Sequence, residues 1–261
     1  RSAPGCGEIE VVTVASYRLG IDIGGTFTDL MLFDPGTGSM DFMKVLTTPD
    51  DLSRGVLKGI RAITEARETS AEEISSAIHG STIGINTIIE RKGARTGLIT
   101  TEGFEDVLLI GRQTRPRIYD WTVGRPRPLV PGFLRKGVRE RISYKGEILE
   151  PLDLEGLRDS LRHLKEDGAE SVAICLLHSY ANPSHEKEIE RALRSMWPDA
   201  YVSVSSGLLP EFREYERMST TVANAYIGPI VSKYIEDLEK SVEDVGVRQL
   251  LVMQANGGLM T

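Results

Sequence analysis

The sequence contains little cysteine, since only Cys6 and Cys175 occur among its 261 residues. Two cysteines cannot form a disulfide framework, and without a CxxC pair they do not indicate a zinc site. Long apolar runs are absent as well: segments such as Val172–Leu177 are far shorter than the roughly 20 residues that span a bilayer. We therefore expect a cytoplasmic protein that has no disulfide scaffold and does not enter a membrane.

An excess of positive charge is also missing. The chain has 31 basic and 38 acidic side chains, which give a net charge of −7. This balance argues against a protein that binds nucleic acid or an anionic membrane by bulk charge. With 40% hydrophobic residues the chain is rich enough in apolar surface to fold, and its length fits one large domain or two ordinary ones.

The first residues do not have the features of a signal peptide. Residues 1–17 contain Pro4, two glycines and only a short apolar stretch, without the long apolar middle and cleavage site that such a peptide requires. We expect this segment to be a disordered tail or a cloning remnant.

From Arg18 onward the pattern predicts an α/β fold. Residues 18–33 are expected to form two strands joined by a tight turn at Gly24-Gly25, and Met40–Leu46 a third strand. Helical and strand patterns then alternate along the chain, which is typical of α/β proteins. A last helix is expected from about Glu211 to Asp244, interrupted at Gly228-Pro229. The fold should therefore open with a three-stranded antiparallel meander.

One segment, residues 111–150, differs in composition from the rest. Between Arg112 and Lys145 it carries ten basic residues against Asp120 and Glu140, together with four prolines. We predict an irregular insertion that ends in two short strands. Arginines among aromatic residues also occur in single-stranded nucleic-acid binders. Because the remainder of the chain is strongly acidic, a solvated loop or a docking surface for an acidic partner is the preferred interpretation.

The sharpest motif is Asp22-Ile-Gly-Gly-Thr-Phe-Thr-Asp29, at the first predicted turn. Glycine can adopt positive φ there and lets a ligand approach bare backbone N–H groups, which attract anions. The hydroxyls of Thr26 and Thr28 are further donors. An ordinary hairpin with a Gly-Gly turn is the alternative, but two aspartates and two threonines within eight residues favour phosphate binding.

Asp22 adds a metal to this hypothesis. It lies between Ile21 and Ile23, so strand alternation points its carboxylate away from the apolar face. A carboxylate beside phosphates would repel them unless a cation lies between the two, and we therefore predict that Asp22 contacts Mg²⁺ or a Mg²⁺-bound water.

The motif Asp-x-Gly-Gly-Thr-x-x-Asp resembles the phosphate-binding hairpin of the actin, Hsp70 and sugar-kinase superfamily of ATPases. Further blocks resemble the hydantoinase A/oxoprolinase family; they are His79–Thr82, Glu90–Phe104, Tyr215–Tyr226 and Gln254–Met260. That family includes ATP-dependent N-methylhydantoinase, 5-oxoprolinase and nucleotide-binding subunits of acetone and acetophenone carboxylases. The resemblance extends from about residue 18 to residue 261.

The resemblance implies an actin/Hsp70/sugar-kinase-like (ribonuclease H-like) ATPase lobe and a hydrolase that uses Mg²⁺ and ATP. Such an enzyme phosphorylates the oxygen of a cyclic amide of the hydantoin or 5-oxoproline type, and a hydantoinase B-type partner subunit or domain completes the reaction. Asp22 would be the catalytic residue and the metal ligand. The ATP-binding residues would be Gly24, Gly25, Thr26, Phe27, Thr28 and Asp29, although Asp29 could equally stabilise the hairpin.

Three alternatives stay open. The chain could be the nucleotide-binding subunit of a carboxylase that acts on a ketone, a non-catalytic nucleotide-sensing module, or a sugar or acetate-type kinase. The stretch Glu90–Thr101 favours the hydantoinase-type enzyme.

The resemblance also implies a division of the chain. Residues 18–205 would form the first ATPase lobe, with the insertion at about 111–150, and residues 206–261 would begin the following domain. The family carries a second Asp-x-Gly-Gly-Thr hairpin that does not occur here. We therefore expect this chain alone to bind nucleotide weakly and to have little activity.

Five other candidate residues have simpler interpretations. His79 could face the site, but a buried structural histidine is favoured. Cys175 and His178 have a metal-like spacing without a second ligand pair. Lys92 and Arg95 could bind an anion, although an exposed turn after a helix is the preferred reading of that segment.

Overall fold

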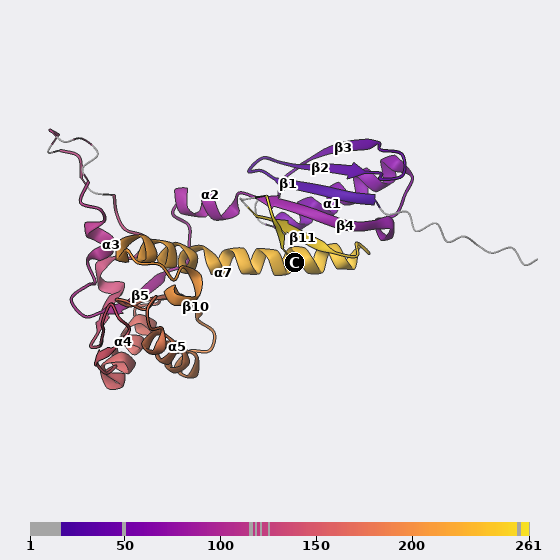
Figure 1. Ribbon diagram of the computed structural model, residues 1–261. Coiled ribbons are helices and arrows are strands. Elements are labelled where there is room, and N and C mark those ends of the chain that lie inside the picture. The colour runs from indigo at the N-terminus through magenta and orange to yellow at the C-terminus, as the bar shows by residue number, and fades with distance from the viewer. Residues whose placement is uncertain are drawn as a thin grey trace, which may run out of the picture. The chain divides into compact units, whose positions relative to one another are not determined.

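The computed structural model describes residues 17–48, 51–254 and 257–260, apart from residues 115, 116, 118, 121 and 125. The chain divides into two compact units (Figure 1): unit 1 contains the residues up to Thr82 and from Lys233 onward, and unit 2 contains Ile83–Ser232. The predicted tail lies outside the described residues, except for Tyr17, which begins the first strand. No described helix has both the length and the apolar character needed to cross a membrane.

Unit 1 is built on a six-stranded mixed sheet with the order β12-β11-β4-β1-β2-β3. Its strands are β1 (Tyr17–Ile23), β2 (Phe27–Phe33), β3 (Met40–Leu46), β4 (Ile74–Ser81), β11 (Leu250–Met253) and β12 (Leu259–Met260). β2 is antiparallel to both β1 and β3, while β4 is parallel to β1. The predicted opening meander and the α/β class are therefore confirmed.

Strand alternation gives this sheet one buried and one exposed face. Leu19, Ile21 and Leu30 point to the buried face, where α1 (Leu52–Arg67) packs. Gly59 of α1 permits the close approach, because a Cβ there would lie 2.2 Å from Leu30 Cδ1. Asp51 caps the helix by accepting a hydrogen bond from the Arg54 N–H. A 3-10 turn, η1 (Ala71–Glu73), leads into β4.

Unit 2 contains a four-stranded parallel sheet with the order β10-β9-β5-β6. Its strands are β5 (Thr96–Thr101), β6 (Arg135–Val138), β9 (Ser171–Cys175) and β10 (Tyr201–Val204). Every residue of β5 and β9 is buried, as expected for a parallel sheet covered on both faces. A separate hairpin pairs β7 (Arg141–Ile142) with β8 (Ile148–Glu150).

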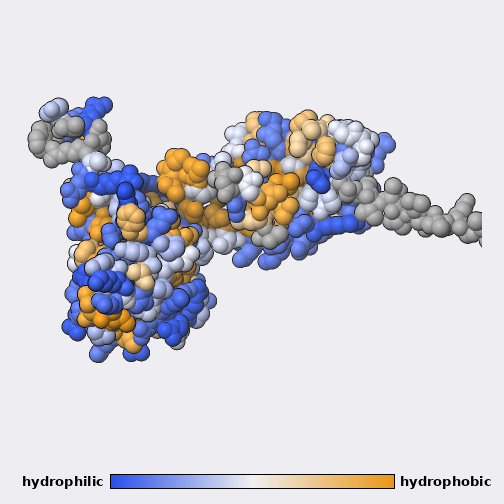
Figure 2. All heavy atoms as spheres, viewed as in Figure 1, coloured by the Kyte–Doolittle hydropathy of each residue, from blue (hydrophilic) through white to orange (hydrophobic). Residues whose placement is uncertain are grey.

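Several shorter helices lie within unit 2. They are α2 (Ile83–Ile89), α3 (Val107–Ile110), α4 (Leu154–Glu166), α5 (Ser184–Met196) and α6 (Ser205–Leu208), with a 3-10 turn η2 (Gly132–Leu134). Leu157, Leu161 and Leu164 form the buried face of α4. Figure 2 shows hydrophobic residues gathered over α2, where Ile85 and Ile89 are exposed.

The prediction that residues 111–150 are irregular up to their final strands is wrong for part of this segment. Residues 135–138 form β6, which pairs with β5, and Leu134 and Val138 are buried in the core of unit 2. The sequence Arg-Lys-Gly-Val hides this strand because it is short and begins with two basic residues. The Arg135 guanidinium is neutralised by Asp106 at 3.0 Å, which allows a basic residue to begin a core strand.

The predicted interruption of the last helix is also wrong. α7 is continuous from Glu214 to Asp244 with Pro229 inside it, and the boundary between the two units falls within it. Proline removes one backbone hydrogen bond, but tertiary packing holds this helix together. Gly228 lies against the Tyr201 ring, where a Cβ would come within 2.2 Å of Cζ. The glycine therefore permits close packing and does not end the helix.

Candidate nucleotide-binding site

The turn between β1 and β2 carries the predicted phosphate-binding residues. The two strands remain paired up to Ile23 and Thr28, and the Gly24 N–H then donates to the Phe27 carbonyl at 2.9 Å. Gly25 and Thr26 lie at the exposed tip. Their own N–H groups donate to no residue that the structure describes. Two adjacent free N–H groups on a turn form a concavity that attracts an anion.

The turn is fixed from beneath by two threonines. The Thr47 hydroxyl donates to the Gly24 carbonyl at 2.9 Å, and the Thr47 N–H donates to the Thr26 carbonyl at 2.9 Å. The Thr28 and Thr47 hydroxyl oxygens are 3.0 Å apart. Because Thr47 already uses its single O–H, Thr28 must be the donor in that pair. Both carbonyls are turned inward, which holds the shape of the turn without a ligand.

The Thr28 hydroxyl points into the protein toward Thr47. From the sequence we had expected it to face a bound phosphate. Thr28 is fully buried while Phe27 and Asp29 on either side are exposed. The alternation of β2 is the sequence signal that could have shown this, because Thr28 shares its side of the strand with Leu30. We infer that Thr28 positions the turn.

The expected reason for the two glycines is also corrected. Neither Gly24 nor Gly25 has a positive φ. A Cβ on Gly24 would lie 3.1 Å from the Phe27 carbonyl oxygen, whereas a Cβ on Gly25 would meet nothing within 4 Å. The fold therefore does not require glycine at position 25, and the space beside its backbone is open to a ligand.

Asp22 lies beside the turn with its carboxylate exposed, as predicted. Its cross-strand neighbour is Asp29, so the two side chains share one face of the sheet. Asp29 pairs with Lys44 at 3.0 Å, while Asp22 makes no hydrogen bond or salt bridge to another described residue. One carboxylate near two free N–H groups fits Mg²⁺, which usually takes one or two protein carboxylates and completes its shell with phosphate oxygens and water.

A metal site made of protein ligands alone is absent from the described residues, which contain no group of three His, Cys, Asp or Glu side chains that could hold an ion. Burial raises the pKa of the Cys175 thiol to about 12, so it stays protonated. His178 lies 3.2 Å from the Tyr180 hydroxyl through its Nδ1.

His79 points to the face of the sheet opposite Asp22, since the strand register pairs Asp22 with Gly80. Its ring is fully buried, and its Nε2 lies 2.8 Å from the Tyr234 hydroxyl. Burial lowers the pKa of His79 to about 4, so the ring is neutral near pH 7. These contacts are those of a structural histidine.

The remaining basic candidates are mostly engaged with other side chains. Lys92 pairs with Glu90 at 2.6 Å, and the Arg95 guanidinium lies over the Phe133 ring. Within the insertion, five basic residues pair with carboxylates; the pairs are Arg112–Glu216, Arg117–Asp120, Arg135–Asp106, Lys136–Asp167 and Arg139–Glu150. Much of the positive charge of this segment is therefore neutralised locally.

Comparison with protein families matches almost the whole described chain. The hydantoinase/oxoprolinase N-terminal region matches residues 18–197, and the hydantoinase/oxoprolinase domain matches residues 217–261. The chain belongs to the hydantoinase/oxoprolinase family. The resemblance inferred from the sequence blocks is thereby confirmed.

Characterised members of the hydantoinase/oxoprolinase family align with nearly all of this chain. Caprolactamase subunit alpha from Pseudomonas jessenii is 38% identical over 93% of the chain and 36% of its own length. Acetophenone carboxylase gamma subunit from Aromatoleum aromaticum is 36% identical over 82% of the chain and 31% of its own length. 5-Oxoprolinase 1 from Arabidopsis thaliana is 34% identical over 95% of the chain and 22% of its own length. The chain thus spans about a third or less of the length of these relatives.

Two solved structures share the fold of this hydantoinase/oxoprolinase chain. The ATP-dependent caprolactamase of Pseudomonas jessenii has a TM-score of 0.85 at 36% identity, covering 93% of this chain and 36% of its own. The nucleotide-free structure of an acetone carboxylase has a TM-score of 0.85 at 28% identity, covering 94% of this chain and 37% of its own. The predicted actin-like ATPase fold class is confirmed.

Proposed function

We propose that this hydantoinase/oxoprolinase chain supplies the phosphate-binding part of an ATP-dependent hydrolase of cyclic amides. The observation that carries the proposal is the turn at Gly25 and Thr26, which has two free N–H groups, open space where a Cβ would stand, and an exposed carboxylate beside it. Support for the substrate class comes from relatives named caprolactamase and 5-oxoprolinase, because caprolactam and 5-oxoproline are both cyclic amides.

In this proposal the N–H groups of Gly25 and Thr26 bind phosphate oxygens, and the Thr26 hydroxyl adds a third donor. Gly24 shapes the turn through its bond to Phe27, and Thr28 holds it from below. Asp29 holds Lys44 next to the site through a salt bridge, in which the Lys44 Nζ lies 3.0 Å from the Asp29 Oδ1. These side chains would thus position a nucleotide without moving, which is the main protein contribution to phosphoryl transfer.

Asp22 would hold Mg²⁺ or one of its water ligands. Its carboxylate is exposed and not committed to a described partner, which leaves it available to an ion. Bound Mg²⁺ and ATP would supply a phosphoryl group for the substrate oxygen, which makes the amide carbon a better electrophile. The task of Asp22 is to keep the charge of that ion close to the phosphates.

We further propose that a hydantoinase B-type subunit or domain completes the reaction, since relatives are named as subunits of caprolactamase and acetophenone carboxylase. Within this chain, residues 18–205 would form the first lobe and residues 206–261 the start of the next domain. The two family matches, which end at 197 and begin at 217, support that division.

A carboxylase subunit is the second candidate, supported by the acetone carboxylase structure with its equal TM-score. Sequence identity separates the two candidates only slightly, with 38% to caprolactamase subunit alpha against 36% to the acetophenone carboxylase gamma subunit. A nucleotide-sensing module without catalysis is a third candidate. Stimulation of ATP hydrolysis separates the three: we expect 5-oxoproline, hydantoin or a lactam to stimulate the full-length protein together with its partner, and ketone with bicarbonate to have no effect.

The direct test of the site is Gly25→Val. The side chain would fill the open space at the turn, so we expect the affinity for Mg²⁺ and ATP to fall by more than about tenfold in calorimetric titration of the full-length protein. The matched control is Gly207→Val in α6, because a Cβ there also meets nothing within 4 Å. Neither change should alter the melting temperature by more than a surface substitution does. Unchanged ATP affinity in Gly25→Val would refute the phosphate-binding assignment.

A further inference from the structure

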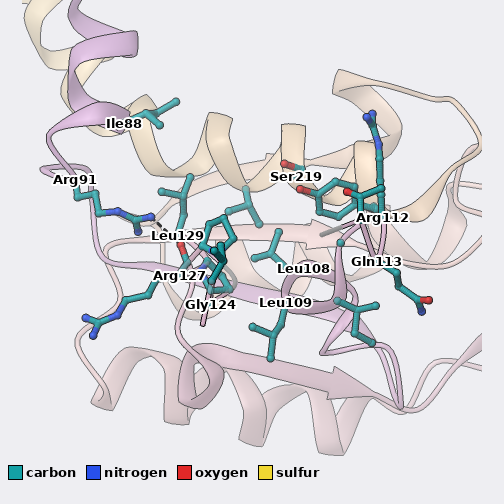
Figure 3. Close-up of a pocket in the computed structure, with 18 of the residues that line it drawn as sticks. Ile88, Arg91, Leu108, Leu109, Arg112, Gln113, Gly124, Arg127, Leu129 and Ser219 are labelled. Atoms are coloured by element: carbon teal, nitrogen blue, oxygen red, sulfur yellow. Dashed lines mark hydrogen bonds between the residues drawn. The ribbon is translucent and has the colours of Figure 1, made fainter. Parts of the chain in front are cut away.

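A cavity of about 850 Å³ lies in unit 2 (Figure 3). Its size falls within the roughly 300–1,000 Å³ that is usual for small-molecule sites. The end of α2, the segment around α3, residues 120, 123, 124 and 126–129, and the first turns of α7 contribute to its wall. The phosphate-binding residues proposed above do not belong to it.

The middle of the cavity is apolar. Leu108 and Leu109 come from α3, Leu129 from the insertion and Val222 from α7, and Figure 3 shows the two α3 leucines between the charged ends. Leu109 is 38% exposed. An apolar ligand that covered this wall would gain roughly 25 cal/mol for each Å² removed from water.

One end of the cavity carries unpaired positive charge. The Arg91 Nη2 donates to the Arg127 backbone carbonyl at 2.8 Å, which holds the guanidinium at the wall. Its other N–H groups have no partner among the described residues, and Arg127 forms no ion pair with any of them. Figure 3 shows these two arginines together at one end, while Arg112 and Gln113 lie at the other.

The other charged residues that line the cavity, Arg112 and Asp120, already have partners of their own. Arg112 pairs with Glu216 at 2.6 Å. Asp120 accepts from the Thr122 hydroxyl at 2.6 Å and lies 3.7 Å from Arg117. The cavity therefore has an apolar patch within a largely polar lining and net positive charge at the Arg91 end. The hydroxyl-bearing residues Tyr215 and Ser219 line it from α7.

We propose that this cavity binds a small organic carboxylate with a compact apolar body. The carboxylate pairs with the Arg91 guanidinium, whose planar donors match the two oxygens of a carboxylate. The apolar body covers Leu108, Leu109 and Leu129. A neutral ligand of the same shape leaves the arginine unpaired and binds more weakly. This site is independent of the nucleotide site in unit 1, so either proposal can fail without the other.

Phenylacetate and phenylacetamide provide a matched pair of probes, since they share one shape and differ in charge. We expect saturable binding of phenylacetate to the protein at least about tenfold tighter than that of phenylacetamide, measured by calorimetry or ligand-observed NMR. In Arg91→Gln, which keeps a donor for the Arg127 carbonyl, the two affinities should differ by less than about twofold. The control is Arg158→Gln on α4, an exposed arginine without a described ion pair, in which the tenfold preference should persist.

A second variant tests the cavity itself without changing Arg91. Ser219→Leu adds volume to the α7 wall, so binding of both probes should be lost while the melting temperature stays within the range of a surface change. Four results would overturn the proposal: equal affinity for the two probes, no saturable binding up to about 10 mM, the same loss of preference in Arg158→Gln as in Arg91→Gln, or unchanged binding in Ser219→Leu.

Discussion

Two glycines, each close to one of the proposed sites, have opposite structural roles. Gly25 stands in open space, where a Cβ would touch nothing within 4 Å, whereas a Cβ on Gly93 would lie 2.1 Å from Tyr226 Cε1. The packing of the described residues thus makes no demand for glycine at position 25, and the proposed phosphate site would explain its presence. Gly93 is required by packing, because it lets the segment that carries Arg91 lie against α7, where the Ala94 N–H donates to the Tyr226 carbonyl at 2.9 Å.

The comparison teaches that a glycine inside a sequence motif does not by itself indicate a binding site. Both glycines lie in blocks that resemble the hydantoinase/oxoprolinase family. Only the space around each one separates a glycine that a ligand needs from one that a neighbouring ring needs.

Gly93→Ala should destabilise the protein strongly. The added Cβ overlaps the Tyr226 ring, and overpacking of this kind costs about 3 kcal/mol. Urea denaturation should show a lower midpoint, and Gly207→Ala, whose Cβ meets nothing within 4 Å, is the matched control. If Gly93→Ala proves as stable as the control, the packing role of Gly93 is wrong.

Acid should weaken unit 1 through His79. Burial lowers the pKa of folded His79 to about 4, below the ordinary histidine value of 6.5, so the unfolded chain binds the proton first as the pH falls. Stability is therefore fully present above pH 6.5 and is lost between pH 6.5 and pH 4. A drop to pH 5 should cost about 2 kcal/mol.

The measurement for His79 is the free energy of unfolding at several pH values. In His79→Gln the slope between pH 6.5 and pH 5 should be smaller than in the wild type, although the variant also loses the contact with Tyr234 and is less stable throughout. Equal slopes in the two proteins would contradict a buried neutral histidine.

Thr47→Val should have the smallest effect on stability of the three. It changes the hydrogen bonds that hold the β1–β2 turn. The change removes the donor to the Gly24 carbonyl and the acceptor of the buried Thr28 hydroxyl, which should cost about 1–2 kcal/mol. Because the turn then loses its fixed shape, Mg²⁺ and ATP should also bind more weakly.

Thr220→Val, an exposed threonine on α7, is the control for the loss of a hydroxyl. Calorimetry and thermal melting are compared for both variants. ATP affinity that is the same in Thr47→Val as in the wild type would show that the turn does not depend on this anchor.

The secondary structure was largely accessible from the sequence. The opening meander was predicted as it is observed, and β3 was predicted with its observed bounds. β6 was missed because it is short and begins with Arg135 and Lys136, whose charges are balanced by residues distant in sequence. Pro229 was misjudged for a similar reason, since residues of α7 on both sides of it, such as Tyr226 and Tyr234, are buried in contacts that the local sequence does not reveal.

The sequence by itself determined the chemistry of the β1–β2 turn, because Asp22, Gly24, Gly25 and Thr26 are neighbours along the chain and strand alternation decides which of them are exposed. Tertiary structure alone decided that Thr47 holds the turn from beneath and that Arg91 meets Leu108 and Leu129 at one cavity. The physical reason is distance along the chain. Short-range patterns specify local backbone and side-chain direction, whereas a cavity wall or a buried hydrogen bond between remote residues exists only after the strands and helices have packed.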